Sequence, residues 1–336
     1  MHWEYLPGVL GKVIGRFALA VFFLLIFSGL AHTQTAAASA VRQKIILDTD
    51  IGGDIDDAFA LALALSSPDI ELLGVTTAWG DTQTRARLVD RLLCETGMQS
   101  IPVRAGVSMP STVPINQARW AEAFPKPAKP YASAIGFILE QIRRYPQQIT
   151  LVGIAPFSNL GALIEQDPGT FRQLKRIVMM GGSIYRGYND LGYTPNHGPD
   201  PEYNIAADIP SSRRVFAAGV PLFVMPLDST QLKLDEVKRQ IIFEDSTPLT
   251  DALTLLYHQW GQQTPTLYDP VAVAFAIAPE ICPTQPMRIE IDDKGYTRVV
   301  TGSPNAEVCL DSKGDQFFNL YMTRVLGQKL IGHCAK

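Results

Sequence analysis

The stretch that decides the fold runs from Lys44 to Leu65 and reads KIILDTDIGGDIDDAFALALAL. A short apolar run predicts a buried strand, and the longer run at its end predicts a buried helix. Between them lie five aspartates within ten residues: Asp48, Asp50, Asp54, Asp56 and Asp57. Carboxylates packed together repel one another and raise each other's pKa values, so a site of this kind requires a partner of opposite charge.

Outward from this stretch, apolar runs alternate with helical patterns along the chain. This alternation predicts an α/β fold, Rossmann-like, with a mainly parallel open sheet and helices on both faces in a single domain. We expect strands at 44–50, 70–80, 101–107, 148–156, 176–183, 220–228 and 305–311, and helices at 56–67, 84–97, 131–146, 157–168, 211–219, 247–262, 268–279 and 316–327. The segment 287–302 predicts a hairpin, and the polar segment 187–201, rich in glycine and proline, predicts a long loop of the kind that often carries function.

Composition narrows the classes of function. The 336 residues are 46% hydrophobic and 18% charged, which is ordinary for a globular protein with a large core. The formal net charge is −4, and no stripe of lysine and arginine indicates a nucleic-acid surface.

The first forty residues resemble a secretory signal. Lys12 and Arg16 precede an apolar core of fifteen residues, 17–31, and a run of small residues follows to residue 40. We therefore expect residues 1–40 to be a signal peptide and residues 41–336 to be exported to the periplasm or secreted. An uncleaved N-terminal anchor is the open alternative, and only then would the protein contact a membrane.

Four cysteines form an even set that an oxidising compartment would allow to pair. Cys282 and Cys309 flank the predicted hairpin and are the preferred pair. Four cysteines allow three full connectivities, and the sequence does not exclude four free thiols. The chain contains no CxxC spacing, which argues against a thiolate zinc site.

The aspartates have a consistent interpretation as a metal site. In an open parallel sheet, ligands bind beyond the carboxyl ends of the strands, which is where Asp48 and Asp50 fall. The glycine pair at 52–53 allows a sharp turn, and Asp56 and Asp57 then open a helix, where the helix dipole favours negative charge. Oxygen ligands of this kind suit Ca²⁺ or Mg²⁺.

The acidic motif has three interpretations other than a metal site. A solvated loop with a helix cap explains one or two aspartates better than five around a glycine pair. An EF-hand loop starting at Asp48 would need a glutamate where Phe59 stands, so it fails. A phosphatase with Asp48 as nucleophile remains open, although it does not need the second aspartate cluster.

Together with four further motifs, the acidic stretch resembles the inosine-uridine-preferring nucleoside hydrolase family. DTDIGGDIDDAFAL is similar to the family signature, and four further motifs follow in the family's order. These motifs are GIAPFSNLGALI, IVMMGGS, PEYNIAADI and YDPVAVA. The resemblance covers about residues 44–326 and implies the family's fold, hydrolysis of the N-glycosidic bond of ribonucleosides to free base and ribose, a Ca²⁺ cofactor, and a homodimer or homotetramer.

The resemblance also implies roles for individual residues. Asp50 would bind the metal and act as general base on a metal-bound water, with Asp57, Asp269 and the Ser158 carbonyl as further ligands. The sugar and the base would be contacted by Asp56, Met180, Asn196, His197, Glu202, Asn204 and Tyr268. The family's motif usually has two fewer residues between its aspartate pairs, so the assignment of Asp56 and Asp57 rests on the AFAL that follows them.

Some residues of this chain differ from the family pattern, and the differences affect what can be predicted about the preferred nucleobase. Tyr268 stands where many relatives have histidine directly before the aspartate matched by Asp269. Asp81 stands where many have asparagine, and Ser158 where many have threonine. The sequence therefore leaves open the preferred base and the way in which the leaving base is protonated. An exported nucleoside- or ribose-binding protein with weak or lost catalysis is the alternative function.

Overall fold

The computed structural model describes residues 42–122, 124–191, 193, 197–332 and 334. The predicted signal peptide lies outside the described residues, all of which belong to one compact unit. Within the described residues, no helix combines the length and the apolar character needed to cross a bilayer.

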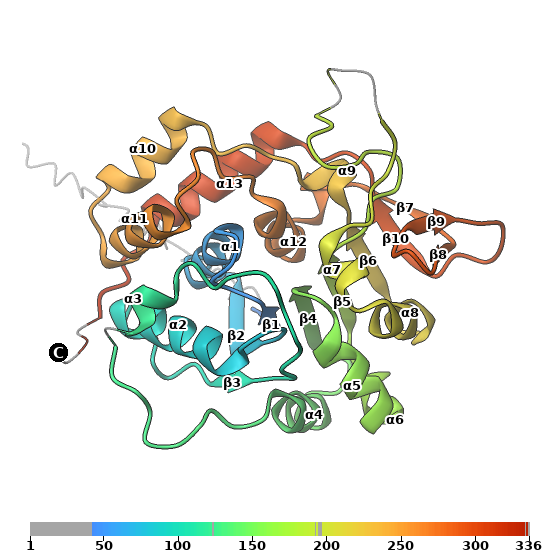
Figure 1. Ribbon diagram of the computed structural model, residues 1–336, viewed down its shortest axis with the longest axis horizontal. Helices are drawn as coiled ribbons and strands as arrows, with labels where there is room; N and C mark the ends of the chain where they lie inside the picture. Colours follow the sequence, from blue (N-terminus) through green and yellow to red (C-terminus); the bar gives the residue numbers. More distant parts are fainter. Residues whose placement is uncertain (1–41, 123, 192, 194–196, 333, 335–336) are drawn as a thin grey trace, which may run out of the picture. The chain divides into compact units, whose positions relative to one another are not determined.

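A mainly parallel sheet forms the centre of this unit (Figure 1). Eight strands lie in the order β3-β2-β1-β4-β5-β6-β10-β7, and only the β10–β7 pair is antiparallel. This confirms the predicted fold class. The strands are β1 Gln43–Thr49, β2 Ile70–Thr77, β3 Val103–Ala105, β4 Ile149–Ile154, β5 Arg176–Met180, β6 Leu222–Met225, β7 Thr284–Met287 and β10 Ala306–Cys309.

Helices cover both faces of the sheet because alternate strand residues point to opposite sides. In β1, Ile45 and Leu47 join the core under α1, α11, α12 and α13, while Ile46 joins the core under α4, α5 and α8. Figure 1 shows these two sets of helices on opposite sides of the strands. The helices are α1 Asp56–Leu65, α2 Thr82–Glu95, α3 Ala118–Glu122, α4 Ala134–Arg144, α5 Ser158–Gln166, α6 Pro168–Phe171, α7 Tyr203–Ala207, α8 Ile209–Ala217, α9 Leu227–Thr230, α10 Glu236–Glu244, α11 Pro248–Trp260, α12 Tyr268–Ile277 and α13 Gly314–Gly327, with a 3₁₀ turn η1 at Pro279–Ile281.

The predicted hairpin forms a small separate sheet of β8 Ile289–Ile291 and β9 Thr297–Val299. Two disulfides are present in the described chain. Cys282–Cys309 is the pair preferred from the sequence, and Cys94–Cys334 ties the C-terminal segment to the end of α2.

The turn after β1 positions the acidic motif. Gly52 has a φ of +113°, and a Cβ there would lie 2.6 Å from Leu88 and 2.7 Å from Ile115. Glycine is therefore required both by the backbone conformation and by the close packing. The chain then enters α1, every residue of which is buried, so the first turn of this helix places its carboxylates inside the protein.

Candidate functional site

A cavity of about 220 Å³ lies beyond the carboxyl ends of β1, β4 and β5. This is where an open α/β sheet places its ligand site. Segments distant in the sequence meet there: the turn after β1, the start of α1, the start of α7 and the start of α12. The lining residues are Asp50, Gly53, Asp54, Asp56, Asp57, Val113, Ile154, Met180, Tyr188, Glu202, Tyr203, Asn204, Tyr268 and Asp269.

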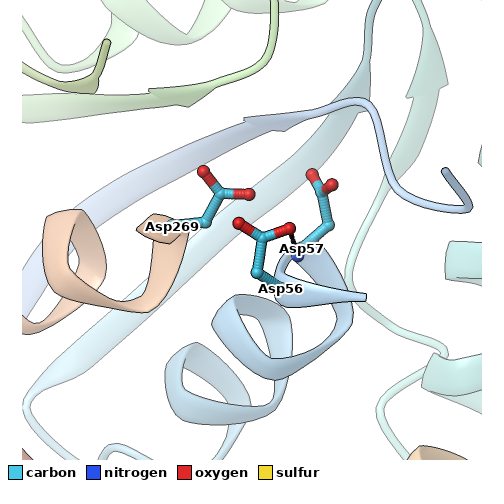
Figure 2. Close-up of side chains that lie close together, drawn as sticks. All are labelled: Asp56, Asp57 and Asp269. Carbon is cyan, nitrogen blue, oxygen red and sulfur yellow. Dashed lines mark hydrogen bonds between the residues drawn. The ribbon is translucent and has the colours of Figure 1, made fainter. Parts of the chain in front are cut away.

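Three buried carboxylates form the centre of this cavity. Asp56 and Asp57 occupy the first turn of α1, and Asp269 occupies the first turn of α12. One oxygen atom from each lies within 4.8 Å of the others. Figure 2 shows the three side chains converging from the two helices. We call Asp56, Asp57 and Asp269 the acidic trio.

Hydrogen bonds orient two members of the trio. Oδ1 of Asp57 accepts from the Thr49 hydroxyl at 2.5 Å and from the Asp50 backbone N–H at 3.2 Å. Oδ1 of Asp56 accepts from the backbone N–H of Asp57 at 3.2 Å. The end of β1 and the start of α1 therefore hold one oxygen of each of these two carboxylates in place.

The electrostatics of the trio favour a bound cation. Burial raises the pKa of Asp269 well above its usual range, and the charged neighbours that raise it further are Asp56, Asp57, Asp50 and Asp54. Burial and neighbouring aspartates also raise the pKa values of Asp56 and Asp57. A divalent cation bound by oxygen ligands relieves this repulsion, so the donor set fits Ca²⁺ or Mg²⁺.

Two further buried carboxylates predict how stability depends on pH when the protein is kept in chelator. Burial raises the pKa values of Asp48 and Glu202 to about 7, above those of the unfolded chain. Between about pH 4 and about pH 7 the folded state therefore binds more protons, so the free energy of unfolding falls as pH rises.

Thermal unfolding in chelator should consequently give a melting temperature that falls from pH 5 to pH 7. Saturating Ca²⁺ should flatten this slope, because a cation favours the ionised carboxylates. A melting temperature that rises over this interval in chelator would contradict the electrostatic account.

Asp50 lines the cavity but does not belong to the trio. Its Oδ2 lies 3.8 Å from Nη2 of Arg85. Burial raises the pKa of Asp50 to about 6, and the Arg85 charge opposes this rise. The carboxylates that meet are thus Asp56, Asp57 and Asp269. The sequence predicted Asp50 as a metal ligand and Asp56 as a ribose contact, and these two roles stay predictions.

Glu202, Asn204 and Met180 also line the cavity. Glu202 caps α7, and its carboxylate accepts from the backbone N–H groups of Gly182, Asn204 and Ile205. The Asn204 amide donates to the Met180 carbonyl at 3.2 Å. Glu202 and Asn204 therefore add polar groups to the lining of the cavity that contains the trio.

Tyr268 directly precedes Asp269 and forms an edge-to-face pair with Tyr188, with ring centroids 6.3 Å apart. Burial raises the pKa of Tyr268 to about 12, although the Thr266 hydroxyl opposes the rise. Tyr268 is therefore a neutral phenol that can donate a hydrogen bond. The two rings form an aromatic surface in the cavity wall.

Two further residues predicted from the sequence, Ser158 and His197, are not among the described residues that line this cavity. Ser158 is buried and opens α5, four residues after the Ile154 that lines the cavity. His197 is exposed, with Nε2 3.2 Å from the Tyr188 carbonyl and 3.9 Å from Asp200. Asn196 lies outside the described residues.

Several groups at this site were not predicted from the sequence. Asp54, Tyr203 and Val113 line the cavity, and Nη2 of Arg85 lies 3.8 Å from Oδ2 of Asp50. One signal was available for Arg85, which stands three, four and seven residues before Leu88, Val89 and Leu92 in α2. This spacing puts a charged residue on the apolar face of a helix.

Comparisons with known proteins agree on one family. The family model described as inosine-uridine preferring nucleoside hydrolase matches residues 45–319. A pyrimidine-specific ribonucleoside hydrolase RihA from Citrobacter koseri is 28% identical over 319 residues, which cover 84% of this chain and 97% of the relative.

Solved structures agree in fold. A plant nucleoside hydrolase matches with a TM-score of 0.74 and 22% identity, covering 85% of this chain and 99% of that one. A purine-preferring ribonucleoside hydrolase from Gardnerella vaginalis matches with a TM-score of 0.72 and 24% identity, covering 85% and 98%.

Proposed function

Because this chain belongs to the inosine-uridine preferring nucleoside hydrolase family, it is a ribonucleoside hydrolase, and we propose that it acts with a bound Ca²⁺ and with Asp50 as general base. The observation that carries the proposal is the acidic trio, in which three buried carboxylates converge at the end of the sheet. When bound, a divalent cation lowers the pKa of a coordinated water and binds neighbouring hydroxyls.

We assign the residues of the chain to three parts of the site. Asp57 and Asp269 would hold the cation, together with the Ser158 carbonyl and Asp50 that the family resemblance implies. Asp56, whose carboxylate lies within 4.8 Å of the other two, would contact the ribose. Glu202 and Asn204 would contact the sugar, and Met180 also lines the cavity.

The chemistry follows from this arrangement. As the bond between ribose and base breaks, the sugar develops positive charge, and the surrounding carboxylates stabilise it. Asp50 takes a proton from the attacking water, whose oxygen bonds to the sugar carbon. The base leaves with the electron pair of the broken bond and takes up a proton.

The base would lie against Tyr188 and Tyr268, which both line the cavity. Tyr268 can donate a hydrogen bond to an acceptor on the base. The names of the similar proteins include both pyrimidine-specific and purine-preferring hydrolases, so we leave the base preference to experiment.

A direct test is ribose release from inosine, uridine, cytidine, adenosine and guanosine, assayed with Ca²⁺ and with chelator. We expect ribose from at least one nucleoside, a loss of at least about 100-fold in chelator, and recovery when Ca²⁺ is restored. Tight nucleoside binding without ribose release would favour the binding-protein alternative. Release that is insensitive to chelator would contradict the role of the cation.

We also propose that the protein is exported, with residues 1–40 removed as a signal peptide. The two disulfides support this proposal, because such bonds persist in oxidising compartments. A homodimer or homotetramer is proposed from the family resemblance alone. Cell fractionation with N-terminal sequencing tests export, and light scattering tests assembly.

A further inference from the structure

Arg85 is a charged residue with no exposed surface, on the inner face of α2. Each of the three nitrogens of its guanidinium lies near a polar group. Nε donates to the Trp79 carbonyl at 2.9 Å, and Nη1 donates to the Ile51 carbonyl at 2.9 Å. Nη2 makes no hydrogen bond within the described residues and lies 3.8 Å from Oδ2 of Asp50. Burying a guanidinium costs free energy unless its charge is paired, so the position of Nη2 next to Asp50 needs an explanation.

The two carbonyls belong to turns that the guanidinium holds together. Ile51 starts the glycine-containing turn that follows Asp50. Trp79 has a φ of +64°, a conformation that non-glycine residues adopt rarely and that is often found at functional sites. This conformation belongs to the turn that presents the Trp79 carbonyl to Nε of Arg85.

Gln117 supports the same turn from the other side. Its backbone N–H donates to the Gly52 carbonyl at 3.1 Å, and its buried side-chain amide donates to the Asp54 carbonyl at 2.8 Å. Together with the bond from Arg85 to Ile51, three carbonyls of the turn, those of Ile51, Gly52 and Asp54, are held by side chains or backbone of other segments. Asp50 directly precedes the first of them.

We propose that Arg85 is a positioning residue for hydrolysis, which fixes the turn after Asp50 and holds one oxygen of the Asp50 carboxylate so that the other serves the cavity. This inference rests on the proposed function of Asp50. The planar guanidinium can bind two carbonyls and approach a carboxylate at once, whereas a lysine ammonium is a single point charge. Residues Ile51 and Asp50 are thus fixed by a single side chain on another element.

A purely structural arginine would need only its two carbonyl partners. The distinguishing feature is Nη2, which approaches Asp50 and makes no hydrogen bond in the described chain. The test must therefore measure coupling between Arg85 and Asp50, both in turnover and in a property that does not depend on turnover.

The experiment compares Arg85→Met and Arg85→Lys with Arg87→Met. Arg87 lies on the same helix and also donates to backbone carbonyls, at Glu122 and Phe124, which makes it a matched control. For Arg85→Met we expect kcat to fall about 100-fold with KM changed less than about threefold, because misplacing a reacting group by about 1 Å has an effect of this size. The kcat of Arg85→Lys should fall less than that of Arg85→Met, and the kcat of Arg87→Met should remain within about threefold of the wild-type value.

Each substitution is also combined with Asp50→Asn. If Arg85 acts through Asp50, Arg85→Met should reduce kcat little further in the Asp50→Asn background. In chelator, the melting temperature of the Arg85→Met/Asp50→Asn variant should be higher than the value obtained by adding the changes of the two single variants. Arg85→Met alone leaves the buried Asp50 carboxylate without its partner, whereas the double variant no longer contains that carboxylate. Arg87→Met with Asp50→Asn should be additive in both measurements.

Additivity of Arg85→Met with Asp50→Asn in turnover and in melting temperature would overturn the proposal. So would a folded Arg85→Met variant with wild-type kcat. If Arg85→Met does not fold, Arg85→Lys in the same two backgrounds decides the question. If the wild-type protein releases no ribose, the proposed function fails, while the melting temperatures still show whether Arg85 and Asp50 interact.

Discussion

The Asp50→Asn variant is expected to lose about 10²–10⁴-fold in kcat, the range attributed to general base catalysis, while KM for the nucleoside changes much less. The amide has the size of the carboxylate but cannot accept the proton of the attacking water. Without a cation, burial raises the pKa of Asp50 to about 6 against the opposing charge of Arg85, which is above the usual range of an aspartate. Single-turnover kinetics on saturating nucleoside would measure the chemical step directly.

Asp54→Asn is the matched control for this experiment. Asp54 belongs to the same turn and lines the same cavity, yet its Oδ1 accepts from the Ile55 backbone N–H, and the residue is exposed. We expect this variant to stay within about tenfold of the wild type in kcat. Equal losses in the two variants would mean that the negative charge of the turn matters and that no single carboxylate acts as base. The melting temperature of each variant with Ca²⁺ shows whether a loss reflects the cation rather than the base.

The fold could be predicted because its signals are local. Buried parallel strands read as apolar runs, and the helices between them read as amphipathic segments, so alternation alone indicated the sheet and its two layers. The antiparallel strand β7 was not predicted. Its sequence, TQPM, contains Pro286 and has no apolar alternation, and it is a strand because β10 provides its hydrogen-bonding partner at the edge of the sheet.

The candidate site could be predicted only in part, for a physical reason. Asp56 and Asp57 are adjacent in the chain, so their convergence at the start of a helix follows from the sequence. Asp269 lies beside them because α12 packs against α1. Only the family resemblance predicted that Asp269 would join these two residues.

Arg85 and Asp54 were not assigned roles for a related reason. Arginine is expected at the surface of a helix, and its burial depends on carbonyls from two turns that are distant in the sequence. Asp54 belongs to the turn that is two residues longer than the usual motif, so no family position indicated its contact with the cavity. In both cases the function of the residue depends on tertiary contacts rather than on local pattern.

Asp269→Asn should abolish measurable turnover, with a loss of at least about 10³-fold, and at the same time stabilise the protein in chelator. The neighbours that raise the pKa of Asp269 after burial itself are all aspartates, so an uncharged side chain of the same shape removes repulsion from the folded state. With Ca²⁺ the order should reverse. A cation at 100 times its dissociation constant stabilises the wild type by about 2.7 kcal/mol, which raises the melting temperature of a domain of this size by roughly 4–5 °C. The variant should lose most of that increase.

The stabilisation in chelator separates this account from a structural role for Asp269. If Asp269 supported the fold through hydrogen bonds or packing, its replacement would lower the melting temperature with and without Ca²⁺. If it is one of three carboxylates that only a cation can hold together, the melting temperature rises in chelator and the response to Ca²⁺ is lost. Asp251→Asn is the matched control, because Asp251 is also in the first turn of a helix but is exposed, and its replacement should leave the Ca²⁺ response intact. An Asp269→Asn variant that is destabilised in chelator and keeps the full Ca²⁺ response would remove the acidic trio from the mechanism, whatever its activity.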